Sequence, residues 1–410
     1  MPHALLGLAA FPLLAWVMSE DRRAVSPRRV ALALLVQGVL AVVLLRLPGV
    51  TDALLLLNEG VRVLEEATNE GARFMFGYLA GGDLPFEERT PGGAFIVAFR
   101  VLPLVLVVSA LSAVLVHVGL LPFVIRQVAR LVRRVFHTSG ALAFGAAASI
   151  FFGIIEGPVL VRAWLPRMNR SELFALLTCG MATVAGTVMV LYASIIEPVM
   201  PGALGQVLVA SVLSVPAALC MAHVMVPGEA GADAALPEPS RTDDSAVEAL
   251  MRGTQEGTRM VLDIAAAIVV LFAMVHLVNR GLGLAPTDTP VTLQGLVGTL
   301  FTPLVWLAGV PWDEAATAGR LMGTKVVLNE FVAYLELGEV AEALSPRSRR
   351  IVVTALCGFA NLGSMGILVG GLGSTLPDRR AELASLAARA VVAGNLATLL
   401  TGAVVALAAP

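Results

Sequence analysis

The sequence has little charge and few aromatic or cysteine residues. Of its 410 residues, 14% are charged, 6% are aromatic and three are cysteines. Soluble domains carry about 25% charged residues, so this composition excludes a soluble globular protein, and the shortage of charge also excludes a disordered one. Cys179, Cys220 and Cys357 lie in apolar segments without metal-ligand spacing, which predicts neither a disulfide framework nor a zinc site. The net charge of −2 gives no indication of a nucleic-acid partner.

Apolar residues make up most of what remains. The hydrophobic fraction is 57% and the mean hydropathy is +0.85. This composition is typical of an all-α polytopic membrane protein in a lipid bilayer. The sequence lacks a nucleophile elbow, an HExxH motif and a P-loop. We therefore expect neither an enzyme nor an ATP-driven pump, and no cofactor.

The hydropathy pattern predicts about eight transmembrane helices. Arginine-rich loops follow the first and third of them, which places those loops in the cytoplasm and the N-terminus outside. The predicted spans are Ala4–Met18, Val30–Leu45, Ala94–Leu121, Leu173–Ile196, Val207–Val226, Met260–Val278, Ile351–Gly371 and Leu383–Ala409.

Two polar segments separate some of these spans. Leu54, Leu57, Val61 and Leu64 recur at steps of three and four, which predicts an interfacial amphipathic helix, although a solvated loop is an alternative. The segment Gly228–Ser245 is polar and reads as a cytoplasmic linker.

Two apolar segments are too broken for single spans. Ser139–Arg170 is interrupted at Gly153 and Gly157-Pro158, and Asp313–Leu337 is interrupted around Gly323-Thr324. Each half of the first segment is about half a bilayer long at about 1.5 Å per residue. We expect two re-entrant helical hairpins, because irregular backbone at membrane depth must be buried in protein or line a cavity.

An internal repeat accompanies the hairpins. The segment Cys179–Gly186 aligns without gaps with Cys357–Ser364, and each follows a broken hairpin. Small residues at helix interfaces are an alternative source of the similarity. On the predicted topology the two hairpins lie on opposite faces, so the repeat would be inverted, as in secondary transporters that bind substrate between discontinuous helices.

Each hairpin carries a glutamate that we expect to be buried. A carboxylate at membrane depth costs roughly 2.5–3.5 kcal/mol on insertion scales, so Glu156 and Glu330 are candidate functional residues, with capping of the hairpin tip as the alternative. Asn361 and Ser364, with Asn329, could hydrogen-bond a polyhydroxylated solute near the second acid. Phe359 could pack against an aromatic ring or be an ordinary core residue. Hydroxyls near the helix breaks, at Ser149 and Thr183, could hold a small cation.

At these residues the sequence resembles the concentrative nucleoside transporter family. The most specific matches are GTKVVLNEFVAY (Gly323–Tyr334) and ALCGFANLGSMGI (Ala355–Ile367), preceded by FTPLVWLAGVPWDEA (Phe301–Ala315). The similarity runs from about Pro91 to the C-terminus. The resemblance implies a bacterial inner-membrane homotrimer that imports nucleosides with Na⁺ or H⁺.

The resemblance also implies a scaffold and a mobile transport domain. Residues 1–135 would hold scaffold spans and the interfacial helix, and residues 259–290 a further scaffold span. Residues 136–227 and 291–410 would each hold a hairpin and transport-domain helices, and residues 228–258 a cytoplasmic linker and interfacial helix.

The same resemblance assigns roles to single positions. Glu330, Asn361 and Ser364 match residues that hold the ribose, and Phe359 matches one that lies against the base. Gly153 and Glu156 match the base-reading motif of the first hairpin, but Ile154 and Ile155 replace its two polar residues. In the Na⁺ site, Thr183 replaces a serine, Phe152 and Val184 would contribute carbonyls, and Ser149 stands where Na⁺-coupled members have asparagine. That last change keeps proton coupling open, with Glu156 or Glu330 as the carrier.

These departures leave two other functions open. The chain could transport another ribosyl-like or polyol solute. It could also be a non-transporting membrane gate or sensor of the same fold, an interpretation supported mainly by the isoleucine pair.

Overall fold

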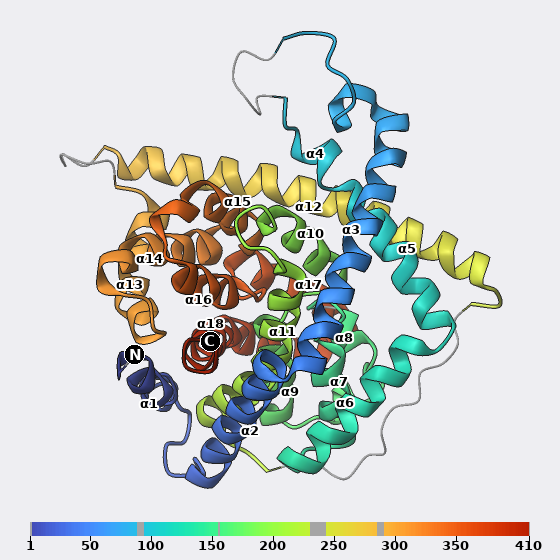
Figure 1. Cartoon of the computed structure of the whole chain (residues 1–410). Helices are drawn as coiled ribbons and strands as arrows, with labels where there is room; N and C mark the ends of the chain where they lie inside the picture. Colours follow the sequence, from blue (N-terminus) through green and yellow to red (C-terminus); the bar gives the residue numbers. More distant parts are fainter. Residues whose placement is uncertain (1, 88–93, 155, 230–242, 285–290, 410) are drawn as a thin grey trace.

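The computed structural model describes residues 2–87, 94–154, 156–229, 243–284 and 291–409. These residues form helices joined by turns, and none of them lies in a strand. The N-terminal part contains α1 (Pro2–Val17), α2 (Pro27–Arg46), α3 (Pro48–Phe76), the 3-10 helix η1 (Gly77–Ala80) and α4 (Val97–Arg100). Figure 1 shows that α3 extends along one side of the remaining helices.

The other helices fall into two runs with the same order of elements. Each run has a helix, a connecting helix, a helix pair, an interrupted helix and a final long helix. The first run consists of α5 (Pro103–His117), α6 (Leu120–Phe136), α7 (Gly140–Ala148), α8 (Glu156–Val159), η2 (Leu165–Arg167), α9 (Arg170–Ala182), α10 (Gly186–Ile196) and α11 (Ala203–Met225). The second consists of α12 (Ala246–Leu282), α13 (Leu293–Leu307), α14 (Trp312–Val327), α15 (Glu330–Val340), η3 (Ala341–Ala343), α16 (Pro346–Leu356), α17 (Leu362–Thr375), η4 (Pro377–Arg379) and α18 (Arg380–Ala408).

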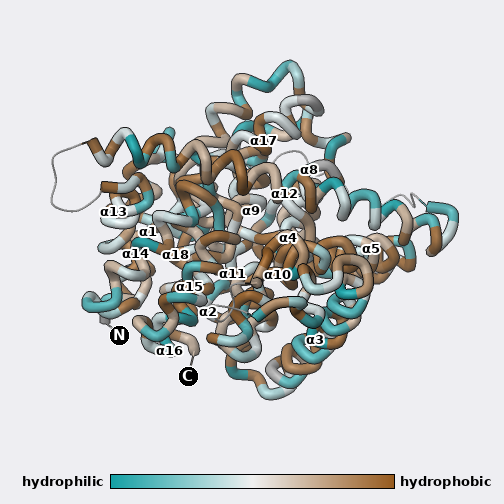
Figure 2. The backbone as a smooth tube through the Cα atoms, turned by 90° about the horizontal axis from the view of Figure 1, so that it is seen from above, coloured by the Kyte–Doolittle hydropathy of each residue, from teal (hydrophilic) through white to brown (hydrophobic). Residues whose placement is uncertain are grey.

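The helices have the length and composition of a multi-pass membrane protein. Six helical segments among the described residues are long and apolar enough to span a bilayer, and three shorter apolar helices accompany them. In Figure 2 the tube alternates between hydrophilic and hydrophobic colours along α3, whereas α5 and α10 are mainly hydrophobic. The amphipathic helix predicted around Leu54–Leu64 is therefore confirmed as a helix, within the 29 residues of α3.

The two helix pairs for which hairpins were predicted differ in detail from the prediction. In the first, α8 has four residues and is followed mainly by turns, so its second arm is not a regular half-helix. In the second, the helices separate at Leu328-Asn329, and the predicted break around Gly323-Thr324 is wrong. A Cβ on Gly323 would lie 2.3 Å from the carbonyl oxygen of Gln294 in α13. Gly323 therefore lets α14 pack closely against α13. From the sequence alone, such a glycine cannot be told from one that breaks a helix.

Small residues join α5 to α12. Cβ atoms added to Gly253 and Gly257 of α12 would come within 2.6 Å of Ala113 and 2.9 Å of the Ser109 side chain. A G-x-x-x-G spacing on one helix face lets two membrane helices approach this closely. The helices that begin the two runs, α5 and α12, therefore pack closely against each other.

Other helices enclose the final helix, α18, which is seen nearly end-on in Figure 1. It contacts α1, α2, α9, α11, α16 and α17, and most of its residues are buried. Gly394 explains one of these contacts, because a Cβ there would lie 2.8 Å from the Met181 side chain of α9. An Ala-rich helix thus packs against both interrupted helices.

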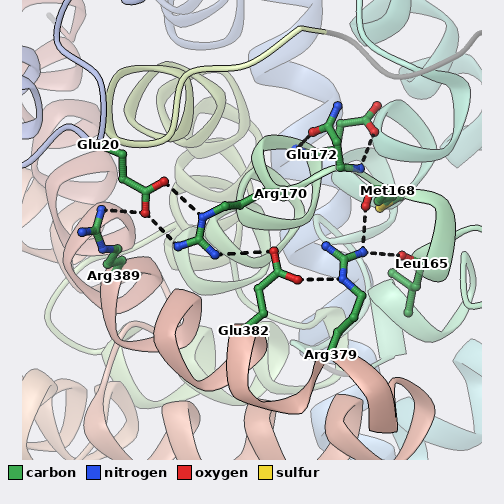
Figure 3. A network of polar contacts seen from close by, with 9 residues as sticks. Glu20, Leu165, Met168, Arg170, Glu172, Arg379, Glu382 and Arg389 are labelled. Carbon is green, nitrogen blue, oxygen red and sulfur yellow. Dashed lines mark hydrogen bonds and ion pairs between the residues drawn. The ribbon is translucent and has the colours of Figure 1, made fainter.

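An ion-pair network ties the α1–α2 loop to the ends of α9 and α18 (Figure 3). Arg170 lies 2.8 Å from Glu20 and 3.4 Å from Glu382, and Arg389 lies 3.1 Å from Glu20. Arg379 contacts Glu382 at 2.7 Å and donates to the Met168 carbonyl. The hydrogen bonds from Arg170 hold the pKa of Glu20 below its ordinary value of 4.5, against the opposing effect of burial.

We predict that Glu20→Gln lowers the melting temperature at pH 7 and that this difference disappears in acid. A carboxyl whose pKa is lowered in the folded state stabilises above its unfolded pKa and loses this effect as pH falls through the folded value. The Glu20 side chain is 27% exposed, so the expected loss is at most about 1 kcal/mol. Thermal unfolding of purified protein from pH 7 to below pH 4.5 measures it.

Glu87→Gln provides the control, because Glu87 is exposed and has no ion pair among the described residues. A Glu20→Gln difference that persists unchanged below the folded pKa of Glu20 would show that charge is not its source.

Candidate functional site

The Glu330 carboxylate is buried at the start of α15. Its side chain is 3% exposed. Oε1 accepts a hydrogen bond from the Tyr192 hydroxyl of α10 at 2.6 Å, and Oε2 accepts one from Nδ2 of Asn361 at 2.9 Å. Asn329 caps α15, since its side chain accepts from the Val332 N–H. The local sequence thus begins α15 at Glu330. The two hydrogen-bond donors to the carboxylate come from Tyr192 of α10 and from Asn361 at the α16–α17 break.

Asn361 and Ser364 complete this group at the start of α17. Asn361 is the N-cap of α17, and its Oδ1 accepts from the Ser364 N–H at 2.7 Å. Both side chains are buried. The half-buried Phe359 lies two residues earlier, and its carbonyl accepts from the Asn361 N–H. We call Glu330, Asn361, Ser364 and Tyr192 the carboxylate cluster. The structure brings together the three predicted second-half polar residues.

A second group of oxygens lies where α7 ends beside the α9–α10 break. The Thr183 hydroxyl is 2.6 Å from the Ser149 carbonyl oxygen and 2.9 Å from that of Cys179. Ser149 follows the last residue of α7, and its hydroxyl donates to the Gly145 carbonyl. We call the predicted cation-site residues the oxygen cluster: Ser149, Phe152, Thr183 and Val184. Among the described residues, no hydrogen bond engages the carbonyls of Phe152 and Val184.

The two clusters meet where the interrupted helices cross. The Phe359 N–H in the α16–α17 break donates to the Thr183 carbonyl in the α9–α10 break at 3.3 Å. A Cβ on Gly358 would lie 2.9 Å from the Met181 carbonyl oxygen, so this crossing requires glycine. One backbone hydrogen bond therefore links Phe359, whose carbonyl accepts from Asn361, to Thr183 of the oxygen cluster.

The first hairpin contributes less than predicted. The Glu156 side chain is open to solvent although protein surrounds most of it, so the expectation that it is buried is only partly met. Its Oε2 accepts from the Gly153 N–H at 2.8 Å, and no contact within the described residues joins it to the carboxylate cluster. Ile154 is buried, with Cγ1 near the position of a Cβ on Gly180 of α9. Ile155 lies outside the described residues.

Two contributors were missed by the sequence-based prediction. Tyr192 donates to Glu330, and Asn395 of α18 donates to the Ala360 carbonyl at 2.8 Å within the second break. Tyr192 is one of three tyrosines in the sequence and lies in an apolar span, which is the signal that could have found it. Asn395 had a similar signal, as a lone amide in the last span.

The carboxylate cluster suits hydroxyl groups better than it suits catalysis. A carboxylate accepts hydrogen bonds, and an amide and a hydroxyl can both donate and accept. Each Glu330 oxygen accepts one hydrogen bond and keeps a further lone pair, so a ligand hydroxyl can donate to Glu330 without displacing Tyr192 or Asn361. The described residues contain no group of three or more His, Cys, Asp or Glu side chains that could hold a metal ion. The oxygen cluster is instead composed of neutral oxygens.

We predict that Tyr192→Phe destabilises the protein more than Tyr334→Phe. Both hydroxyls are buried, but Tyr192 donates to a carboxylate and Tyr334 to the Val353 carbonyl. Hydrogen bonds to charged groups contribute about 1.5–3 kcal/mol and neutral ones about 0.5–1.5 kcal/mol. Thermal unfolding of both variants, alone and with Glu330→Gln, measures the coupling. An equal loss for both tyrosines would contradict an ionised Glu330.

Comparisons with known proteins agree over nearly the whole chain. The family model for the Na⁺ dependent nucleoside transporter C-terminus matches residues 206–406, that for its N-terminus matches residues 6–79, and a nucleoside recognition model matches residues 98–199. An uncharacterized transporter of Haemophilus influenzae is 34% identical over 98% of this chain and 97% of its own length. Nucleoside permease NupC of Helicobacter pylori is 32% identical over 98% of this chain and 97% of its own.

A solved structure shows the same fold. The structure of CNTnw in an inward-facing substrate-bound state has a TM-score of 0.90 to this chain, with 36% sequence identity. The match covers 100% of this chain and 99% of that one. With relatives above 30% identity along its full length, this chain belongs to the family of Na⁺ dependent nucleoside transporters.

Proposed function

We propose that the chain is a cation-coupled symporter that imports nucleosides by alternating access. As a member of a transporter family it is not an enzyme. The observation that carries the proposal is the hydrogen bond from the Phe359 N–H to the Thr183 carbonyl. It joins the carboxylate cluster, which suits a ribose, to the oxygen cluster, which suits a monovalent cation. Occupancy of one cluster can therefore influence the geometry of the other.

The carboxylate cluster would bind the sugar. Glu330 and Asn361 would accept and donate hydrogen bonds to ribose hydroxyls, with Ser364 beside them and Phe359 against the base. Gly153 and Glu156 would approach from the first hairpin, on the base side. The burial of Glu330 and Asn361, each 3% exposed, supports this assignment, because hydrogen bonds to a charged group are stronger where water is excluded.

The oxygen cluster would hold the coupling cation. A hydroxyl has one proton, so only one of the two short Thr183 contacts can be a hydrogen bond at a time. The other brings two oxygens together with no proton between them, an arrangement that a cation would stabilise. The hydroxyl of Ser149 and the carbonyls of Phe152 and Val184 would complete the ligands of Na⁺. If the ion is H⁺, Glu156 or Glu330 would carry it.

The movement would occur between two domains in a homotrimer of the bacterial inner membrane. Residues 1–135 and 259–290 would form the scaffold, supported by the close packing of α5 on α12. Residues 136–227 and 291–410 would form the transport domain, with residues 228–258 as a linker. The repeated order of elements supports two re-entrant hairpins in an inverted repeat.

The deciding experiment is an uptake matrix in proteoliposomes. We expect nucleoside uptake above that of empty liposomes when an inward Na⁺ gradient or an inward H⁺ gradient is imposed. Glu330→Gln should lower uptake by roughly tenfold to a hundredfold, because its hydrogen bonds to a charged group are worth about 1.5–3 kcal/mol. Glu339→Gln, at an exposed position of the same helix, is the matched control. Uptake that neither gradient drives would contradict the symporter.

A substrate panel tests the first hairpin. Aliphatic side chains at 154 and 155 cannot hydrogen-bond a base, and apolar sites discriminate poorly against polar differences. We expect purine and pyrimidine nucleosides to be transported at rates within about tenfold of one another, whereas analogues lacking both ribose hydroxyls should be poor substrates. Strict selectivity for uridine or cytidine would contradict this assignment.

A further inference from the structure

Lys325 is a fully buried cation in the last turn of α14. Its side chain is 0% exposed. Nζ donates to the Ala355 carbonyl at 2.9 Å and to the Thr398 hydroxyl at 3.3 Å. The Thr398 hydroxyl itself donates to the Asn395 carbonyl, so it acts as an acceptor toward Lys325. In the part of the chain that the structure describes, no donor is directed at Nζ, and an ammonium group is a donor without an acceptor.

The oxygens around Lys325 belong to a helix end. Ala355 lies in the last turn of α16, which ends at Leu356 before the second break. Carbonyls in a last turn lack intrahelical partners and form the negative end of the helix dipole. In a membrane protein such groups need an internal partner. Lys325 therefore supplies a positive charge where the interrupted helix exposes partial negative charge.

In the first run, no basic residue lies where the end of α7 meets the interrupted helix. There α7 ends beside the α9–α10 break, as α14 ends beside the α16–α17 break. The Thr183 hydroxyl contacts the carbonyl of Cys179 in the last turn of α9, and Ser149 lies beside it. Both Ser149 and Thr183 are buried and neutral. Residues 140–161 include no Lys, Arg or His.

We propose that the Lys325 ammonium is a tethered cation that fills, in the second run, the position corresponding to the oxygen cluster of the first. The inference rests on the proposed function in taking the oxygen cluster as a cation site. Each run then has one cation at the end of the first half of its interrupted helix, α9 in the first run and α16 in the second. One is supplied from solution and leaves in each cycle, and the other is part of the chain.

Charge balance gives the reason for this asymmetry. Glu330 follows Lys325 by five residues and is buried, so the second helix pair carries its own compensating charge. An uncompensated carboxylate in the interior is costly. Lys325 compensates it through the whole cycle, whereas Glu156 of the first run is exposed and lacks a basic neighbour in its helix pair. Of these two places, only the oxygen cluster is then left for an exchangeable cation.

Replacing Lys325 with a neutral oxygen ligand tests the proposal. Lys325→Thr removes the ammonium, adds a hydroxyl at the end of α14, and leaves the Ala355 and Thr398 oxygens open to a cation and water. We expect the slope of log apparent nucleoside affinity against log Na⁺ concentration to rise by about one over wild type. The ratio of Na⁺ to nucleoside flux in proteoliposomes should rise by about one as well. Lys325→Met, of similar length but without an oxygen, should show neither gain.

A binding measurement separates this inference from transport. The melting temperature of purified protein is compared in NaCl and in choline chloride, without substrate. Na⁺ should raise it more in Lys325→Thr than in wild type, because a ligand that binds only the folded state stabilises it. Adding Thr398→Val should abolish the extra increase. If the wild-type protein takes up no nucleoside, the proposed function is contradicted. The melting temperatures of wild type and Lys325→Thr in the two salts still test the role of Lys325.

Two results would overturn the proposal. One is an equal response to Na⁺ in wild type and Lys325→Thr. The other is failure of Lys325→Thr and Lys325→Gln to fold in either salt, because an added cation should restore the missing charge. Folding of these variants in NaCl but not in choline chloride would support it.

Discussion

The two helix interruptions impose the constraint on which the rest of the structure depends. Backbone N–H and C=O groups at the α9–α10 and α16–α17 breaks lose intrahelical partners, and a bilayer offers no water to replace them. The breaks satisfy part of this need in each other, through the Phe359 N–H and the Thr183 carbonyl. Asn395 supplies another donor, to the Ala360 carbonyl. The interruptions are tolerated because they cross inside the protein.

That crossing accounts for both the composition and the position of the functional residues. Backbones can approach so closely only where side chains are absent or small, as at Gly358 and Gly394. At the second break Asn361 is the N-cap of α17, and at the first break Thr183 lies between α9 and α10. Polar groups that would be costly in lipid are therefore concentrated at one place inside the protein. This is the place at which we propose that substrate and cation bind.

The two runs resemble each other in architecture and differ in charge. Both bring the end of a helix against an interrupted helix, but neutral oxygens occupy this place in the first run and the Lys325 ammonium in the second. The carboxylates differ in the same sense, since Glu330 is buried with two donors and Glu156 is exposed with one. Two runs with the same order of elements thus carry different charges at comparable helix ends.

The sequence by itself determined the membrane class, the all-helical fold and the grouping of Asn361 with Ser364, because these depend on composition and on residues within one helical turn. It also pointed to Glu330, since an acid in an apolar segment needs a reason. Only the tertiary structure decided that Tyr192 donates to Glu330, that Glu156 is exposed and that Gly323 of α14 packs against α13. Those facts depend on which surfaces distant helices present to one another, and local spacing carries no information about that.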